Sequence, residues 1–147
     1  MDVIKVPGPD HPITITPLPG RVRALYQGHE IADSADAVVL REASYPPVVY
    51  FPRADVEMDV LARTELDTYC PYKGHASYFT IRRDGTIAEN GVWSYETPHP
   101  GMAAIAERVA FYPNVVTIEG LDEPAVARAS AAAAAAHAAA DTPNDRL

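Results

Sequence analysis

Cysteine and basic residues are scarce in this sequence, and these shortages exclude several classes of protein. The single cysteine among 147 residues, Cys70, can form neither an internal disulfide nor a zinc site built from several cysteines. Lysine and arginine total 12 against 20 aspartates and glutamates, which gives a net charge of -8. Because an acidic chain repels phosphate backbones, the composition argues against nucleic-acid binding.

Long apolar runs, a signal peptide and the common cofactor motifs are also missing. No stretch approaches the roughly 18 apolar residues of a membrane helix. Residues 1–5 lack the basic start of a signal peptide, and the lone cysteine fits a reducing compartment. No glycine-rich phosphate loop occurs, and the five histidines lack metal-binding spacing. We therefore expect a cytoplasmic protein with no membrane span, no metal and no cofactor.

Proline, by contrast, is abundant, and it favours short strands joined by shaped loops. Fourteen prolines block helix interiors and remove the donors that sheet ladders need. Between them lie β-branched and aromatic runs bounded by turn residues. The pattern predicts a mainly β protein, a β-dominated α+β fold, with one or two short helices. We divide the chain into a proline-rich arm over 1–20, a single compact β-domain over 21–120 and an alanine-rich helical tail over 121–147.

The turn residues locate most of the expected elements. Gln27-Gly28 and Asp84-Gly85 are typical of β-hairpin turns, and Asp33-Ser34 predicts a further turn. A helical segment is expected within 55–66 and a short amphipathic helix over 101–108. Strands are expected at 22–26, 30–32, 38–40, 48–51, 78–82, 86–88, 92–96, 109–112 and 115–118, and 13–16 predicts one edge strand.

The segment around Cys70 is the leading candidate for a functional site. Lys73 follows three residues later, and an ammonium group beside a thiol lowers the thiol pKa, which would make Cys70 a nucleophile. The alternative is that a lone cysteine packs as a small buried hydrophobe. Lys73 is equally a candidate anchor for an anion, assisted by backbone N–H groups near Gly74, or an exposed turn lysine. Thr68 and Tyr72 in the same segment are candidate ligand contacts.

Three further groups are candidates to complete the site. Trp93 and Tyr95 share one face of an expected strand and form either a pocket wall, with Tyr50 and Tyr112, or a core aromatic pair. Glu96 is a candidate acid or base, with an exposed glutamate as the alternative. Arg53 is a candidate for bidentate carboxylate or phosphate binding, with a plain ion pair as the alternative.

The same segments resemble a known family. The resemblance is carried, in order along the chain, by Arg21-Val22-Arg23, Ala32-Asp33-Ser34, Tyr50-Phe51-Pro52, the segment 68–78 with Cys-Pro-Tyr-Lys-Gly, Trp93-Ser94-Tyr95-Glu96 and Ala110-Phe111-Tyr112-Pro113. They look like the bacterial domain-of-unknown-function family numbered 427, across about residues 20–118. The resemblance implies a small, complex β structure similar to the β-tent of Mss4-like proteins. A nucleotidyltransferase label travels with the family, but no residue of this chain supports it, and the family supplies no catalytic residues to carry over.

Two functions from different classes follow from these candidates. In the first, a small, anionic molecule binds or reacts in a Tyr/Trp-lined pocket, and an enzyme would perform acyl or carbonyl chemistry at Cys70. In the second, the chain is a non-catalytic module that binds a ligand or a protein, and Cys70 is structural. A homo-oligomer formed through the extended arm is a further expectation.

Overall fold

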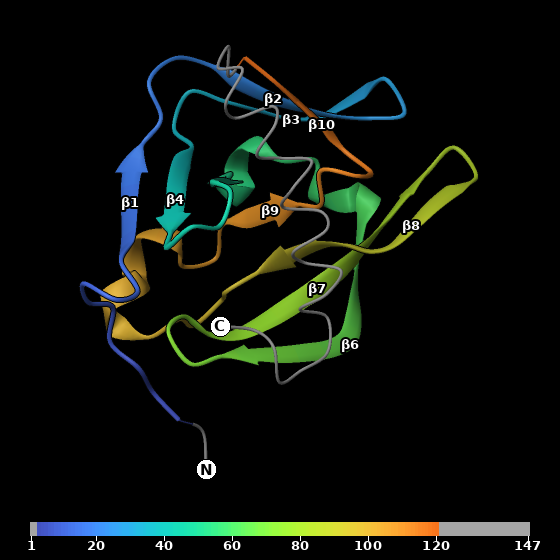
Figure 1. Ribbon diagram of the computed structural model, residues 1–147. Coiled ribbons are helices and arrows are strands. Elements are labelled where there is room, and N and C mark those ends of the chain that lie inside the picture. Colours follow the sequence, from blue (N-terminus) through green and yellow to red (C-terminus); the bar gives the residue numbers. More distant parts are fainter. Residues whose placement is uncertain (1–2, 121–147) are drawn as a thin grey trace.

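The computed structural model describes residues 3–120, in which strands dominate (Figure 1). Three short 3-10 helices lie between the strands: η1 (Arg53–Asp55), η2 (Met58–Val60) and η3 (Pro100–Ile105). The strands are β1 (Ile13–Pro17), β2 (Val22–Tyr26), β3 (His29–Ser34), β4 (Val38–Glu42), β5 (Val48–Tyr50), β6 (Leu61–Cys70), β7 (Gly74–Arg83), β8 (Thr86–Ser94), β9 (Val109–Phe111) and β10 (Thr117–Glu119). The predicted β-dominated fold is confirmed.

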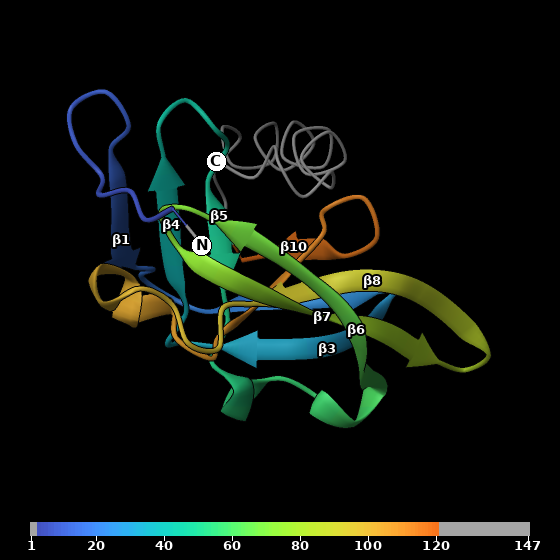
Figure 2. The same ribbon diagram turned by 90° about the horizontal axis from the view of Figure 1, so that it is seen from below.

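These strands form three antiparallel sheets, which Figure 2 shows from below. One sheet has the order β1-β4-β5, a second β10-β2-β3, and the largest β6-β7-β8-β9. A bridge between Phe51 and Val109 joins the end of β5 to β9, and a bridge between Ala32 and Val56 ties β3 to the segment after η1. The sheets are therefore linked by backbone pairing as well as by side-chain packing.

Both faces of the largest sheet are buried in its central strands, and each face belongs to a different hydrophobic cluster. Successive side chains of a strand point to opposite faces. Phe79 and Ile81 of β7 accordingly join one cluster, while Ala76 and Tyr78 join the other. The first cluster is mostly aliphatic. The second, which includes Cys70, is rich in tyrosine and holds the sole tryptophan, Trp93.

The hairpin predictions are confirmed at both turns. Gln27 and Gly28 have φ values of 53° and 79°, and Asp84 and Gly85 have φ values of 50° and 80°. Positive φ at both central residues matches the right-handed twist of the flanking strands, which is why Gly follows a polar residue there. The predicted edge strand also forms, since β1 pairs only with β4 in its sheet.

Two local predictions are wrong. The helix expected within 55–66 is replaced by η1, η2 and the first half of β6, because Leu61, Ala62 and Arg63 pair with β7. Long-range pairing thus overrides a weak local helical pattern. The turn expected at Asp33-Ser34 is the end of β3 instead, since Ser34 pairs with Val22.

The tail predicted over 121–147 lies outside the described residues. Within residues 3–120, no helix has the length and apolar character needed to cross a membrane. The cytoplasmic location and the oligomer through the arm stay predictions.

Candidate functional site

Cys70 ends β6, and Pro71 begins the turn that leads into β7. As the residue before proline favours extended backbone, Cys70 was expected at a strand end, and it pairs there with Gly74. Its exposed fraction is 0%. It packs in the tyrosine-rich cluster, which matches the alternative of a small buried hydrophobe. A nucleophile must meet its substrate, so this burial gives the nucleophile hypothesis no support, and it stays a prediction.

Lys73 turns inward and forms an ion pair with Glu42 of β4. Lys73 is 8% exposed and Glu42 is 5% exposed, and the Lys73 ammonium donates to Glu42 Oε1. The ammonium also lies 5.8 Å from the ring centroid of Tyr95. Burial lowers the pKa of Lys73, but the nearby Glu42 carboxylate, together with Cys70 and Tyr50, more than offsets this, so the pKa is raised and the amine stays charged.

The second carboxylate oxygen of Glu42 is hydrogen-bonded to His11, which lies in the N-terminal arm. Glu42 Oε2 accepts from His11 Nε2 at 2.8 Å. The His11 ring in turn stacks on Tyr72, with centroids 4.0 Å apart and planes 5° from parallel. One buried carboxylate therefore connects the arm, β4 and the β6–β7 turn. We call Lys73, Glu42 and His11 the inner triad.

Beside the inner triad lies the aromatic cluster, defined as Tyr50, Tyr78, Trp93, Tyr95 and Tyr112. Each of these side chains is at most 9% exposed. Trp93 Nε1 donates to the Tyr50 hydroxyl at 3.1 Å, and the rings of Trp93 and Tyr112 are 4.8 Å apart. The hydroxyls of Tyr78 and Thr68 share a hydrogen bond of 2.9 Å. Several polar groups are thus held inside an otherwise apolar cluster.

Burial perturbs the phenol of Tyr50 most clearly. Loss of water around it raises the pKa of Tyr50 to about 12, although the positive charge of Lys73 and the hydrogen bond from Trp93 act in the opposite direction. Tyr50 therefore stays neutral at physiological pH and acts as a hydrogen-bonding group.

Gly74 fixes the turn against the loop before η3. Its φ is +112°, and a Cβ built there would lie 3.4 Å from Cα of Pro98. The backbone N–H of His99 also donates to the carbonyl of Lys73 at 3.0 Å. The turn that carries Lys73 is therefore held by main-chain contact, and Gly74 acts by allowing that contact.

The other charged candidates lie apart from the inner triad. Arg53 and Arg63 both donate to the Glu96 carboxylate, at 2.8 Å from Arg53 Nη2 and at 2.8 and 2.6 Å from the two Nη atoms of Arg63. Ser77 Oγ donates to the same carboxylate at 3.0 Å, and Arg53 also donates to Ser94 Oγ at 3.0 Å. We call Arg53, Arg63 and Glu96 the outer network.

The outer network leaves Glu96 poorly suited to proton transfer. Hydrogen bonds from Arg63, followed by those from Arg53 and Ser77, lower the pKa of Glu96 to about 2 despite partial burial. A carboxylate with this pKa is a weak base and is not protonated near neutral pH, so it cannot supply a proton there. The geometry fits the ion-pair alternative for Arg53. Glu96 is 24% exposed and paired, so it is not the exposed glutamate of its alternative, and the roles of both residues in ligand binding or catalysis stay predictions.

The structure thus gathers part of the predicted site. Lys73, Tyr50, Trp93, Tyr95 and Tyr112 lie with Cys70 in or beside one cluster, whereas Arg53 and Glu96 do not. Glu42, His11 and Arg63 were missed. The burial of Glu42 could have been predicted from the sequence, because Glu42 alternates with Val38 and Leu40 along the strand and so lies on the same buried face. No sequence pattern pointed to His11 or Arg63.

Among residues 3–120, no three His, Cys, Asp or Glu side chains gather closely enough to hold a metal ion. What the inner triad and the aromatic cluster offer chemically is a fixed ammonium, a carboxylate and several hydroxyl groups in a region of low dielectric. Such groups recognise polar molecules through charge-assisted hydrogen bonds.

Comparison with known proteins identifies the family of this chain. A search among curated proteins finds no match to the chain. A family model with the short name NTP_transf_9, described as a domain of unknown function (DUF427), matches residues 14–121. The match begins within β1, so part of the predicted arm is included. The β-tent likeness stays a prediction. Because the match spans well over half of the sequence, the chain belongs to the DUF427 family.

Proposed function

We propose that the protein is a binding module for a small, acidic molecule, which it holds beside Lys73 and the aromatic cluster. In this proposal Cys70 contributes packing, and the protein performs no chemistry at its thiol. The observation that carries the proposal is the charged Lys73–Glu42 pair, at 8% and 5% exposure, next to buried tyrosines.

A buried ion pair is an expensive way to stabilise a fold. Removing two charges from water costs several kcal/mol per ion, and well-packed apolar residues often give equal or greater stability. Packing alone therefore does not explain why Lys73 and Glu42 occupy these positions. Perturbed, buried ionisable groups with aromatic neighbours are instead typical of ligand sites.

The chemistry of the inner triad supports an acidic ligand. Two basic side chains, Lys73 and His11, contact one carboxylate, Glu42. The Lys73 ammonium has three N–H donors, so it can donate to a carboxylate or phosphate group of the ligand as well as to Glu42. The hydroxyl of Tyr50 and the ring of Tyr95, both near Lys73, would contact the rest of the molecule.

The sole tryptophan provides a direct test, because Trp93 lies inside the aromatic cluster. We expect small mono- and dicarboxylic acids or phosphate esters, added as a panel, to change Trp93 fluorescence in a saturable way. Lys73→Met should abolish the change, whereas Arg82→Met, which removes an equal charge from an exposed position of β7, should preserve it. Cys70→Ala should also preserve it.

Native mass spectrometry of the freshly purified protein gives a second measurement. The wild type should carry a small acidic molecule that the Lys73→Met variant lacks. A wild type that neither carries such a molecule nor responds to any acid of the panel would overturn the proposal. Loss of binding in Cys70→Ala but not in Lys73→Met would favour thiol chemistry instead.

A further inference from the structure

The N-terminal arm closes the end of the molecule where the inner triad lies. His11 occupies Glu42 Oε2 at 2.8 Å, and its side chain is 20% exposed whereas that of Glu42 is 7% exposed. His11 also lies flat on Tyr72, one residue before Lys73. The arm is thus the part of the chain that stands between this carboxylate and solvent on its outer side.

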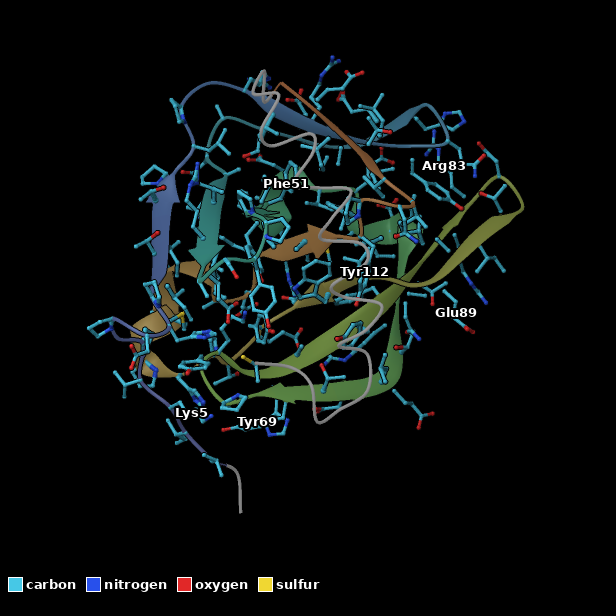
Figure 3. All side chains as sticks on the ribbon, in the orientation of Figure 1. Lys5, Phe51, Tyr69, Arg83, Glu89 and Tyr112 are labelled. Carbon is cyan, nitrogen blue, oxygen red and sulfur yellow. The ribbon has the colours of Figure 1, made fainter. Side chains whose placement is uncertain are left out.

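Among the described residues, a small number of contacts hold the remainder of the arm, including the Lys5 ammonium at 6.0 Å from the ring centroid of Tyr72. The Tyr69 hydroxyl donates to the carbonyl of Val3 at 2.6 Å, and the backbone N–H of Lys5 donates to the carbonyl of Pro71 at 3.0 Å. Figure 3 shows Lys5 and Tyr69 together at this end of the molecule. The apolar side chains of the arm make little contact, since Val3, Ile4 and Val6 are 61%, 65% and 83% exposed. Because apolar burial supplies most of the energy that keeps a segment in place, this arm is weakly attached.

The chain after His11 is fixed, in contrast. The backbone N–H of Ala43 donates to the carbonyl of Pro12 at 2.8 Å, and all five residues of β1 then pair with β4. A movement of residues 3–11 therefore breaks the contacts of His11, Lys5 and Val3 without disturbing the sheet. The boundary between a weakly held and a firmly held segment lies directly beside the inner triad.

We infer that residues 3–11 form a movable cover over the ligand site, and that His11 is the contact that keeps it closed. A ligand would reach Lys73 when His11 leaves Glu42 and the arm lifts from the β6–β7 turn. This inference builds on the proposed function, because the cover matters only if a molecule enters. The opening itself is measurable without any ligand.

The two lysines of the chain, Lys5 and Lys73, allow the cover to be tested in the full-length protein. Lys5 lies in the cover itself and is already exposed, so its acetylation only confirms that the reagent is active, while Lys73 and Cys70 report on opening. We expect His11→Ala to raise the acetylation rate of Lys73, relative to the wild type, and the rate of Cys70 modification by iodoacetamide. Loss of a hydrogen bond to a charged partner predicts an increase of about tenfold. His29→Ala, at an exposed histidine of β3, should leave both rates unchanged.

Urea unfolding of the same variants separates opening of the arm from loss of the fold. Faster labelling of both probes, at concentrations of urea that leave the protein folded, supports the cover. Unchanged labelling in a folded His11→Ala variant overturns it, and so does labelling that rises only in step with global unfolding. If labelling rises but no acid binds in a Lys73-dependent manner, the cover stands and the proposed function fails. If acids bind but associate no faster with His11→Ala than with the wild type, the proposed function stands and the cover fails.

Discussion

The molecule holds two carboxylates in the same manner but in different surroundings. Glu42 lies between Lys73 and His11, and Glu96 lies between Arg53 and Arg63. The side chain of Glu42 is 7% exposed and that of Glu96 is 24% exposed, and Arg63 is 55% exposed. Water and salt screen the charges of the outer network, so its ion pairs cost little desolvation energy to form and little stability when they are lost. The inner triad is unscreened, and its three members depend strongly on one another.

This difference separates a partly exposed network that fastens strands from a buried group of charges whose loss of water offsets much of their attraction. The outer network connects η1, β6 and the end of β8, which is an adequate structural role. Asp67 also lies near enough to Arg63 to offset part of its positive charge. The inner triad also joins separate segments, but at a greater cost of desolvation, and this contrast is the basis of the proposal that Lys73 contacts a ligand.

Removal of the Glu42 carboxylate is the most direct test of the difference between the inner triad and the outer network. We expect Glu42→Leu to lower the free energy of unfolding by about 3–5 kcal/mol, because the Lys73 ammonium is left buried without its partner. Glu89→Leu, at an exposed glutamate of β8, should change it by less than about 0.5 kcal/mol. Urea denaturation measures both values.

A double substitution shows whether the stability lost in Glu42→Leu comes from the unpaired Lys73 charge. Glu42→Leu combined with Lys73→Met replaces the ion pair with apolar groups, so most of the lost stability should return. If the double variant stays as unstable as Glu42→Leu, the ion pair stabilises the fold by itself. Lys73 and Glu42 would then be explained by stability alone, without a ligand.

Glu96→Gln is expected to have a smaller effect, of about 1–2 kcal/mol, since solvent screens its arginine partners. Its pH dependence is specific. The folded protein holds the pKa of Glu96 at about 2, below the ordinary value of 4.5, so the folded state binds this proton less readily than the unfolded chain. The stabilisation by Glu96 is therefore present above about pH 4.5 and lost as the pH falls toward 2.

Stability curves of the wild type and Glu96→Gln should thus converge as the pH is lowered from 5 to 3. Added salt at neutral pH should reduce their difference as well. A constant difference across this pH range would show that Glu96 does not titrate as the two arginines predict.

Tyr50 provides the smallest of the three effects. With a folded pKa of about 12 against an ordinary 10, Tyr50 keeps its proton where the unfolded chain loses it, so stability falls as pH rises between these values. Tyr50→Phe should remove the component of the alkaline tyrosinate absorbance that titrates at about pH 12, and cost about 1 kcal/mol through the lost bond to Trp93. Tyr45→Phe, at 45% exposure, should leave that component in place.

Local chemistry in the sequence predicts the parts of the fold that depend on a few adjacent residues. Gln27-Gly28 and Asp84-Gly85 define hairpins because positive φ is intrinsic to those pairs, and Pro71 ends β6 because it cannot donate to the ladder. The first half of β6 was missed, since its strand character comes from pairing with β7 rather than from its own residues.

The candidate site was predicted only in part for the same reason. Cys70, Lys73 and the tyrosines were identified by residue type, yet Lys73 meets Glu42 across 31 positions of sequence, and His11 approaches from the other side. Contacts between residues so far apart in the sequence cannot be predicted from short segments of the sequence. Arg53 and Glu96 were also identified by residue type, but they meet each other and Arg63 rather than Lys73.

The positive φ of Gly74 has a consequence for engineering. A Cβ at position 74 would lie 3.4 Å from Cα of Pro98, which is an ordinary van der Waals distance, so the positive φ is what calls for glycine here. Alanine at position 74 would adopt an unfavourable φ, and the turn that carries Lys73 would have to rearrange. Residue 74 should therefore be left unchanged in any library of variants of this turn.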